Sequence, residues 1–558
     1  MSKFFITTAI DYTNGAPHLG HAYEKVLADT LARYRRLKGE EVFFLTGVDQ
    51  HGQKVQQTAA KQGMQPQQFV DGVTEKFLAL WKKLDVRYDG WAATTDELHK
   101  KNVRENLQIL WDDKDPATGE SRWLYKKTQR GFYSVRQEQF LTDKERDTQG
   151  EFGSEWQPVE EREEENFYFR LTRDRETGAP GFDPKQWLLD FIDRRSAQGK
   201  PFVVPDFRVA ELRNAVEKLE GDLCISRPAS RLQWGIPFPE SFGAGFVTYV
   251  WFDALLNYIS FVPGHDPRFV GGGESPDGPT FQQWWQSALH VIGKDILIPA
   301  HGVYWPIMLK ACGYPDEEIP TLLVHGWWNL SGEKMSKSLG NSVDPDALAD
   351  RYGAETLRYY LMSDIATGRD ADFSEERLVS KYNVDLANSV GNLLNRSLSM
   401  AHRYYQGMLG KPADPGPFPL EQGTAGWQRA VAAYVESLDG SAVSTALDVP
   451  VGCAGLCNQF IQLQKPWELA KDAGQTEELR AVLYHLADSL RVIAILLSPV
   501  LPKAAHGIFD QLNWKSELAG DDRRFRLEEA VWGGLPDGHV VNVPTPLFPR
   551  METKPTAP

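Results

Sequence analysis

The chain has 558 residues, of which 42% are hydrophobic and 11% aromatic, a composition typical of globular proteins that bury a core. At roughly 100–200 residues per domain, this length predicts three or four structural units. The formal net charge of −15 at pH 7 argues against a protein that coats nucleic acid electrostatically, although a local basic face could still bind it. The composition therefore excludes a chain that is mainly disordered.

Cysteine usage and hydrophobic runs indicate the compartment. No disulfide-framework spacing connects the four cysteines, Cys224, Cys312, Cys453 and Cys457, so we expect a reducing compartment, the cytoplasm. The N-terminal apolar run reaches Asp11 too soon for a signal peptide. The segment VIAILLSPVL is about half as long as a membrane span needs, so we expect no contact with a membrane.

The first fifty residues predict a βαβ unit. KFFITTAI and EEVFFLTG have the length and composition of buried strands, and residues from His18 to about Lys38 carry apolar side chains at helical spacing before Gly39. Strand, helix and strand in this order place the two strands parallel, with the helix across one face. We therefore expect an α/β fold with a Rossmann-like parallel sheet.

Later segments extend this pattern and then change it. ALHVIGKDIL and TLLVHGWW predict two more buried strands, separated by the helix-like HGVYWPIMLKACG. The charge-dense residues 113–222 have a different character and predict an insertion at the edge of the sheet. Beyond about residue 379, three long segments with helical periodicity predict a helical bundle, followed by a loosely packed tail.

The stretch PHLGH, residues 17–21, lies at the start of the first predicted helix, after the first predicted strand. Parallel sheets bind ligands at the carboxyl ends of their strands, and a helix N-terminus suits phosphate oxygens. We expect His18 and His21 to donate hydrogen bonds to phosphates, and Gly20 to let a flat ring or a phosphate approach the backbone. Taken alone, the two histidines could equally be packed or solvated side chains.

A second stretch, GEKMSKSLGN at residues 332–341, favours the phosphate interpretation. Lys334 and Lys337 flank a small hydroxylated residue in a loop rich in glycine and serine, which suits mobile contact with polyphosphate. A solvated lysine loop is the commoner fate of such residues. Finding KMSKS together with HLGH at the head of a βαβ unit makes coincidence remote.

These two motifs resemble the signatures of the class I aminoacyl-tRNA synthetases, and longer segments are similar to the methionyl-tRNA synthetases among them. The segments are AIDYTNGAPHLGHAYEKVLADTLARYRRLKGEEVFFLTGVDQHGQK, YVWFDALLNYIS, HVIGKDIL, DFSEERLVSKYNVDLANSVGNLLNR and QKPWELAKD, which together span nearly the whole chain. The resemblance implies ATP-dependent ligation of L-methionine to tRNA(Met) through a methionyl-adenylate, with release of AMP and pyrophosphate.

The resemblance also implies a domain order. The boundaries expected from it are 1–112 and 223–325 for the two halves of the Rossmann-like catalytic domain, 113–222 for an inserted connective domain, 326–378 for the KMSKS and stem-contact region, 379–546 for a C-terminal α-helical anticodon-binding domain, and 547–558 for the tail.

For ATP, the resemblance implies electrostatic and positional catalysis without a covalent protein intermediate. Mg²⁺ is expected on the ATP phosphates. The implied catalytic residues are His18, His21, Arg227, Lys334 and Lys337. The implied ATP-binding residues are His18, Gly20, His21, Lys294, Asp295, Lys334 and Lys337.

For methionine, the resemblance implies that Asp49 pairs with the α-ammonium, a charge that needs a carboxylate when it leaves water. Aromatic faces suit a polarizable thioether. An aromatic run such as YVWF is otherwise most often plain core. The residues implied to line the side-chain pocket are Ile10, Tyr12, Trp251, Ala254, Leu255, Tyr258, Ile296 and His301.

For tRNA, the resemblance implies that Asn392, Arg396 and Trp467 contact the anticodon, whose splayed bases can stack on aromatic or guanidinium planes. The asparagine could instead bridge helices, and the tryptophan could be core.

Three departures from the family pattern bear on cofactor and geometry. Where many members carry paired CxxC motifs, this chain has Ser134 and Gln137 and no nearby cysteine, so we expect no structural zinc and no other protein-bound metal. Asp11 stands where a proline or apolar residue is common, and KDILIPAH is one residue longer than usual before His301. The additional C-terminal module of dimeric relatives is missing, so we expect a monomer.

Three other functions are weighed against this hypothesis. A synthetase for leucine, isoleucine or valine would usually need a larger editing insertion than residues 113–222, and a cysteine enzyme would need a zinc-bound thiolate. A catalytically silent tRNA-binding paralogue would have no need of His18, His21, Lys334 and Lys337. A small-substrate nucleotidyl transferase of the same superfamily would not need the long helical C-terminal part.

Overall fold

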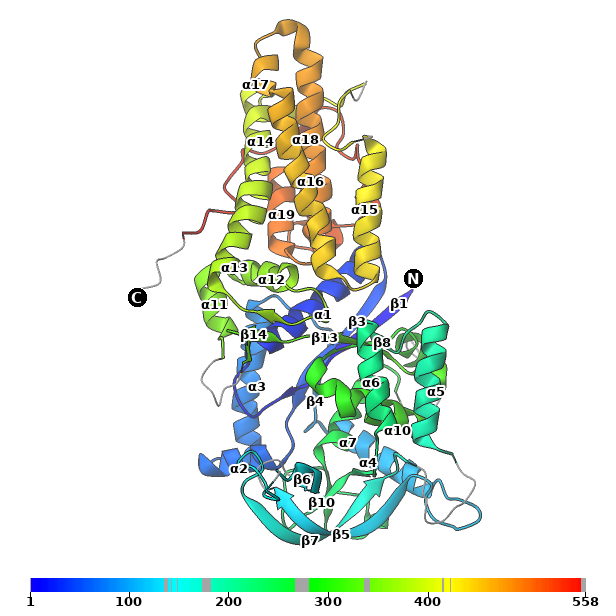
Figure 1. The fold of residues 1–558 in the computed structure, drawn as a ribbon. Coiled ribbons are helices and arrows are strands. Elements are labelled where there is room, and N and C mark those ends of the chain that lie inside the picture. The colour runs from blue at the N-terminus through cyan, green and yellow to red at the C-terminus, as the bar shows by residue number, and fades with distance from the viewer. Residues whose placement is uncertain are drawn as a thin grey trace.

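The computed structural model describes residues 2–134, 139–141, 143–147, 149–172, 182–265, 281–335, 342–413, 416–421 and 423–552. Three parts follow one another along the long axis: a helical bundle at one end, a parallel sheet with its helices in the middle, and a long β-hairpin at the other end (Figure 1). The fold is therefore α/β in its centre and all-helical in its C-terminal third.

The central sheet has the strand order β2-β3-β1-β12-β13-β8, with β4 paired to β3, and every pair in it is parallel. The four strands predicted from apolar runs all belong to it, which confirms the Rossmann-like class. The other three strands, β2, β4 and β8, have only two to four residues and are too short to show a hydrophobic periodicity. The strands are β1 (Lys3–Thr8), β2 (Asp11–Tyr12), β3 (Glu41–Asp49), β4 (Gly90–Ala93), β8 (Val203–Val204), β12 (Leu289–Gly293) and β13 (Thr321–His325).

Strand β8 differs from the sequence-based boundaries, because it lies within the range 113–222 that was assigned to the insertion. It pairs with β13 through Leu322 and Leu323 and closes one edge of the central sheet. Helices α5 (Pro184–Ala197) and α6 (Phe207–Glu217) flank it. A two-residue strand between Pro201 and Pro205 carries no periodicity, so sequence analysis could not place it.

The projecting part of the insertion is an antiparallel sheet of order β6-β5-β7-β9. Its outer half carries mostly exposed charged side chains, whereas at its base Phe167 packs against Phe238, Phe242 and Phe246. Aromatic packing thus anchors the hairpin to the body. The strands are β5 (Leu124–Ser134), β6 (Gln139–Phe140), β7 (Val159–Phe169) and β9 (Leu223–Cys224), with β10 (Ser226–Pro228) and β11 (Phe246–Thr248) beside them.

Helix α1 (Leu19–Leu37) links the sheet to the bundle. One side of it packs on β3 and β1, and the other contacts α12 (Ala354–Ser363). Asp29 of α1 and Arg358 of α12 form an ion pair at 2.7 Å, and both side chains are fully buried. The helix is therefore buried on almost all sides, although its sequence looks amphipathic.

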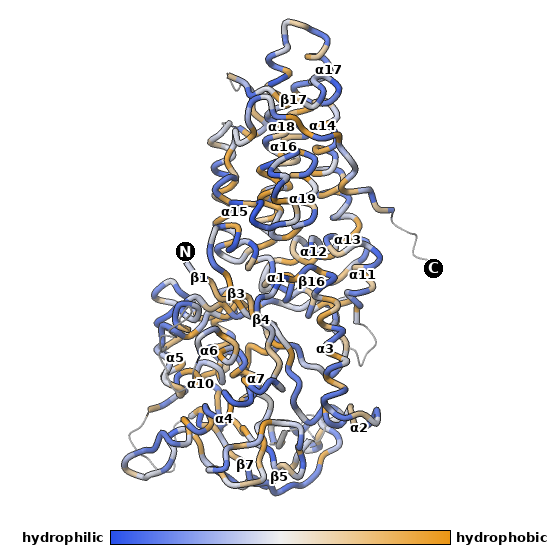
Figure 2. Tube along the Cα trace, turned by 180° about the vertical axis from the view of Figure 1, so that it is seen from behind, coloured by the Kyte–Doolittle hydropathy of each residue, from blue (hydrophilic) through white to orange (hydrophobic). Residues whose placement is uncertain are grey.

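The C-terminal bundle confirms the predicted helical part. Its inner helix, α18, is buried without interruption from Ala481 to Leu497. Figure 2 shows hydrophobic segments of α14, α16 and α18 gathered inside the bundle. Its helices are α13 (Glu375–Lys381), the π-helix η7 (Tyr382–Gly391), α14 (Asn392–Tyr405), α15 (Thr424–Asp439), α16 (Val443–Gln464), α17 (Pro466–Leu469), α18 (Thr476–Leu497) and α19 (Pro502–Gln511).

The remaining elements support these parts. Among the described residues, no helix has the length and apolar character that crossing a bilayer requires. The helices are α2 (Gln53–Lys61), α3 (Pro66–Lys83), α4 (Glu97–Asp112), α7 (Val250–Leu255), α8 (Asn257–Ser260), α9 (Phe281–Trp285), α10 (Trp305–Ala311) and α11 (Pro345–Tyr352). The strands are β14 (Trp328–Leu330), β15 (Glu333–Lys334), β16 (Ala371–Asp372), β17 (Met408–Leu409) and β18 (His539–Val540).

The first part of the C-terminal tail is docked rather than loosely packed. Asn383 exchanges two hydrogen bonds with the backbone of Met551, at 2.8 and 2.9 Å, and Phe548 lies edge-on to Tyr382. The apolar side chains of the tail explain the difference, since they cover the outside of the long helix that ends in α14. Residues 553–558 lie outside the described part.

Candidate active site

Two adjoining cavities open where β1 and β12 end, at the carboxyl edge of the parallel sheet, the usual ligand position in such sheets. Their volumes are about 330 and 290 Å³. A ligand with two parts could therefore occupy both at once. The residues that line both cavities are Ala9, Ile10, Tyr12 and Ile296.

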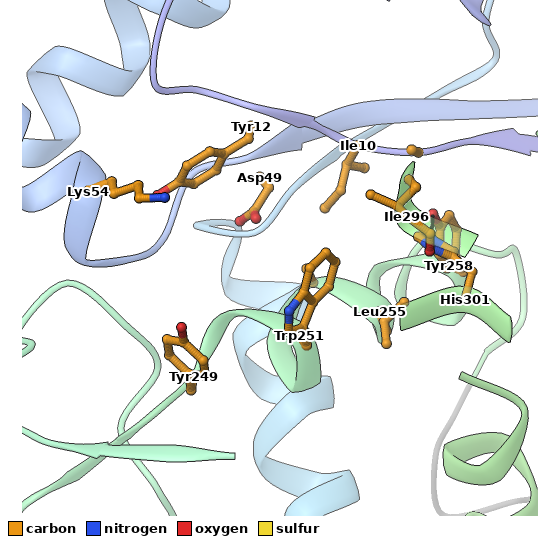
Figure 3. A pocket seen from close by; sticks show the side chains of 12 residues that line it. Ile10, Tyr12, Asp49, Lys54, Tyr249, Trp251, Leu255, Tyr258, Ile296 and His301 are labelled. Atoms are coloured by element: carbon orange, nitrogen blue, oxygen red, sulfur yellow. Dashed lines mark hydrogen bonds between the residues drawn. The ribbon is translucent and has the colours of Figure 1, made fainter. Parts of the chain in front are cut away.

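The first cavity combines apolar and aromatic walls with one buried carboxylate (Figure 3). It brings together all nine residues that the sequence assigned to methionine binding, from Ile10 to His301. Sequence reasoning missed Ala9, Lys54 and Tyr249, although Lys54 ends the family-like segment GVDQHGQK and was available as a signal. The lining residues are Ala9, Ile10, Tyr12, Asp49, Lys54, Tyr249, Trp251, Ala254, Leu255, Tyr258, Ile296 and His301.

Asp49, the last residue of β3, supplies the carboxylate. Figure 3 shows it between Tyr12 and Trp251. Its Oδ1 is buried and accepts no hydrogen bond from the described residues. Burial first, and then the nearby charge of Asp253, raise the pKa of Asp49 well above its ordinary value. A cation that entered this cavity would stabilise the ionised carboxylate and supply the missing partner.

Asp253 is a fixed negative charge beside Asp49. His51 Nδ1 lies 2.7 Å from one of its oxygens and His99 Nε2 lies 2.8 Å from the other, and all three side chains are buried. Burial alone would raise the pKa of Asp253, but the two histidines lower it to about 2. Sequence analysis missed this cluster because its members lie up to 202 positions apart.

At one end of the first cavity, the lining is polar and neutral. The Tyr258 hydroxyl lies 2.7 Å from His301 Nε2, and His301 Nδ1 lies 2.9 Å from the carbonyl oxygen of Ile296. Burial lowers the pKa of His301 to about 4, so the ring is uncharged at neutral pH. The segment before His301 is not a regular helix, because the backbone of Ile298 is extended (φ −117°, ψ 125°) and kinks the π-helix Leu297–Tyr304.

The second cavity surrounds the beginning of α1. Of the residues assigned to ATP, it contains His18, Gly20, His21 and Asp295. Sequence reasoning missed the buried residues Glu24 and His325. The full lining is Ala9, Ile10, Asp11, Tyr12, His18, Gly20, His21, Glu24, Gly293, Asp295, Ile296, His325, Gly326, Trp327, Trp328 and Met335.

The two histidines cap α1 reciprocally. His18 Nδ1 accepts from Gly20 N at 3.1 Å, and His21 Nδ1 accepts from His18 N at 3.0 Å. The rings stack with their centroids 3.7 Å apart. Because both Nδ1 atoms are acceptors, each neutral ring carries its proton on Nε2. Two Nε2–H donors and a helix N-terminus therefore belong to one cavity, a combination that suits anionic oxygens.

Gly20 has a structural reason that differs from the expected one. A Cβ atom at this position would lie 3.0 Å from Cε1 and 3.1 Å from Nδ1 of His18. A side chain would therefore press on the ring that caps the helix. The missing Cβ keeps His18 in place, in addition to any room that it leaves for a ligand.

Family comparisons agree with this geometry. The model described as "tRNA synthetases class I (M)" matches residues 4–152 and 152–398, and the one described as "Anticodon binding domain of methionyl tRNA ligase" matches residues 422–557. The chain belongs to the methionyl-tRNA synthetases. It is thus a class I aminoacyl-tRNA synthetase, as the sequence motifs predicted.

Similar proteins cover nearly the whole of this synthetase. The methionine–tRNA ligase of Thermotoga maritima is 37% identical over 99% of this chain and 81% of its own length. That of Thermosynechococcus vestitus is 36% identical over 98% of this chain and 97% of its own. The Mycobacterium tuberculosis methionyl-tRNA synthetase in complex with methionyl-adenylate superposes with a TM-score of 0.82, at 32% identity, over 99% and 100% of the two chains.

Two residues assigned to the nucleotide lie one side chain away from the cavities. Lys294 Nζ donates to Asp370 at 2.6 Å and lies 3.9 Å from the ring centre of Trp327, which lines the second cavity. The Arg227 guanidinium stacks on Tyr249 at 3.5 Å, and Tyr249 lines the first cavity. In this structure both residues support a wall of the synthetase's site.

The KMSKS lysines are only partly covered. The backbone of Lys334 belongs to β15, which pairs with β14 close to Trp328 of the second cavity. The side chain of Lys334 and all of Lys337 lie outside the described residues. Their assigned contacts with ATP remain predictions.

The residues assigned to the anticodon lie in the bundle. Asn392 donates to Asn458 at 2.9 Å, and Asn458 in turn donates to the Ser389 carbonyl at 3.0 Å, so the asparagine does bridge helices. Arg396 is half-buried on the same helix, α14. Trp467 is half-buried on α17, which stands at the end of the bundle farthest from the sheet (Figure 1). All three side chains are thus partly exposed to solvent, Asn392 included.

Metal-ligating side chains were also sought. Across the described ranges, no group of three or more His, Cys, Asp or Glu side chains could hold a metal ion. In the insertion, Ser134 donates to the Trp156 carbonyl at 2.5 Å, and Arg162 stacks on Tyr133 at 4.7 Å. Gln137 lies outside the described residues. Hydrogen bonds and cation–π contacts hold this part of the hairpin together.

Proposed function

We propose that the chain activates L-methionine with ATP in these two cavities and transfers it to tRNA(Met), releasing pyrophosphate and then AMP. The observation that carries the proposal is Asp49: a buried carboxylate with an unpartnered oxygen stands in an apolar, aromatic cavity that adjoins a phosphate-suited one. An aminoacyl-adenylate with an apolar side chain has matching groups: an ammonium for the carboxylate, a side chain for the apolar cavity and a phosphate for the second cavity.

Methionine binds in the first cavity. Its α-ammonium pairs with Asp49, whose raised pKa falls when the cation arrives. Its thioether lies among Trp251, Tyr258 and Leu255, where sulfur–aromatic contacts contribute about 0.3–1.5 kcal/mol each. The neutral Tyr258–His301 pair in this cavity has no charge to attract a charged side chain.

ATP binds in the second cavity, and the chemistry takes place between the two. The methionine carboxylate attacks the α-phosphorus, the carboxylate–phosphorus bond forms and the bond to pyrophosphate breaks. His18 and His21 donate from Nε2 to oxygens that gain charge, and Lys334 and Lys337 would add positive charge there. Mg²⁺ would neutralise the departing phosphates, with the triphosphate itself as its main ligand, because the described residues offer no cluster of ligands.

The bundle selects the tRNA. Arg396 and Trp467 offer a guanidinium plane and an indole for unstacked anticodon bases, and Asn392 positions the helix that carries Arg396. The terminal adenosine of the tRNA then attacks the adenylate.

The enzyme works as a monomer in the cytoplasm.

A pyrophosphate-exchange assay across the amino acids tests this proposal. Exchange into ATP should require methionine. Asp49→Asn should raise the KM for methionine by about 10–100-fold, since a hydrogen bond to a charged group contributes roughly 1.5–3 kcal/mol, while the KM for ATP changes little. Exchange with another amino acid, or none with any, would refute the assignment. Charging of tRNA with methionine in the absence of pyrophosphate exchange would also refute the assignment.

A further inference from the structure

Two consecutive charged residues interrupt the first turns of α1. Glu24 and Lys25 occupy positions in a helix whose neighbours Ala22, Tyr23 and Val26 are buried apolar residues. The Lys25 side chain is 0% exposed and that of Glu24 is 9% exposed. A lysine buried to this degree is rare unless it is paired, so its partners indicate what it does.

The Lys25 ammonium has three acceptors for its three protons. Nζ donates to Asp11 Oδ1 at 2.7 Å, to Glu24 Oε1 at 2.8 Å and to the carbonyl oxygen of Ala9 at 2.9 Å. Burial alone would lower the pKa of Lys25, but Asp11 and Glu24 raise it above its ordinary value. The ammonium is therefore charged and fully used by the protein itself.

All three acceptors belong to the second cavity, whereas Lys25 does not line it. Asp11 also lies 4.0 Å from His21 Nε2, and the other oxygen of Glu24 lies 3.0 Å from His325 Nε2. Ala9 lines the first cavity as well. One ammonium behind the wall thus connects two carboxylates and, through them, two histidines that face the cavity.

The charge of this wall matters for the ligand. ATP carries a polyanionic triphosphate, and two carboxylates in the wall of its cavity would repel it. The ammonium offsets one of them at contact distance, in a buried position where solvent screens little. It also holds the other charges in one arrangement, since each of its hydrogen bonds is directed.

We propose that Lys25 is a positioning residue for the nucleotide: it sets the charge and the geometry of the second cavity through Asp11 and Glu24 without touching ATP. This inference rests on the proposed binding of ATP in that cavity. Lys25 belongs to neither PHLGH nor KMSKS, so it is a new residue of the proposed site.

Lys25→Met keeps the length of the side chain and removes the ammonium. The KM for ATP in methionine-dependent exchange should rise at least 10-fold, while the KM for methionine changes less than 3-fold. Asp11→Asn added to Lys25→Met removes the excess charge and should recover most of the loss in KM for ATP. A merely structural role would not produce this recovery, since the double variant still lacks the ammonium.

Lys38→Met, at the residue that follows the C-terminal end of the same helix, is the matched control. Lys38 pairs with Asp439, away from both cavities, so its loss should leave both KM values unchanged. Tryptophan fluorescence on methionine binding would establish that Lys25→Met is folded. Equal KM values for ATP in Lys25→Met and the wild type would overturn the inference, as would a double variant no better than the single one. Failure of exchange in the wild type would instead refute the proposed function.

Discussion

At the scale of single residues, burial shifts the pKa of an acid and of a base in the first cavity in opposite directions. Asp49 and His301 line the same cavity, yet burial raises the pKa of the carboxyl and lowers that of the imidazole, because it disfavours the charged form of each. In the empty site, burial thus works against the charged form of both groups. The two differ in their partners, since His301 contacts Tyr258 and Ile296, whereas one oxygen of Asp49 accepts no hydrogen bond from the described residues.

His301 should make the fold sensitive to acid. A histidine in the unfolded chain has a pKa near 6.5, whereas the pKa of His301 in the folded protein is about 4. The contribution of the neutral His301 to the free energy of unfolding is therefore fully present above pH 6.5 and is lost as the pH falls toward 4. At pH 5 the loss amounts to about 2 kcal/mol. Urea unfolding at pH 7 and pH 5 measures it, and His301→Gln should reduce the difference. An undiminished difference in that variant would contradict the assignment.

At the scale of elements, helix α1 contributes both to the second cavity and to the contact with α12. Its first two turns carry the histidine cap and the Glu24–Lys25 pair, which serve the second cavity. Its middle carries Asp29, which faces Arg358 of α12. The helix is long enough to join the second cavity to the helical part of the molecule.

Arg358→Met should destabilise the junction between α1 and α12. The guanidinium donates to the carbonyl oxygens of Leu84, Pro499 and Val500 at 2.8–3.1 Å besides pairing with Asp29. Removing one partner of a buried ion pair costs about 3–5 kcal/mol when the other charge is left unpaired, and because Asp29 keeps Arg33 at 2.8 Å we expect the lower end of that range. Thermal unfolding should therefore begin at a clearly lower temperature.

Lys83→Met is the control for this junction. Lys83 pairs with Asp346 and Asp350 on the surface, where an ion pair contributes little. Its unfolding temperature should match the wild type. If both variants unfold together with the wild type, the buried pair is not a determinant of stability.

At the scale of the whole molecule, the proposed activation site and the proposed anticodon site lie in different parts. The cavities sit at the edge of the central sheet, and α17 stands at the far end of the bundle (Figure 1). A side chain at that end contacts neither cavity. Activation and tRNA recognition are therefore separable by mutation.

Trp467→Ala should separate them. Stacking of a base on an aromatic side chain contributes about 1–3 kcal/mol, so kcat/KM for tRNA charging should fall by roughly one to two orders of magnitude. Methionine-dependent pyrophosphate exchange by the same protein should remain at the wild-type rate. Normal charging by this variant would remove Trp467 from the anticodon site.

Local patterns account for much of the fold. KFFITTAI, EEVFFLTG and the helix between them were predicted to within about two residues, because periodic burial along one element is written in its own side chains. Strand β8 was not, since two residues between prolines show no period. The docked tail was missed for a related reason: its burial depends on Asn383 and Tyr382, which lie far away in the chain.

The sequence by itself determined the α/β sheet followed by a helical bundle, and motif by motif it pointed to the residues that meet in the two cavities. The tertiary structure alone decided which charges face one another: Asp49 with Asp253, and Lys25 with Asp11 and Glu24. The reason is physical. Periodicity records how much of a side chain is buried, whereas a partner for a buried charge comes from packing elements whose sequences carry no mark of each other.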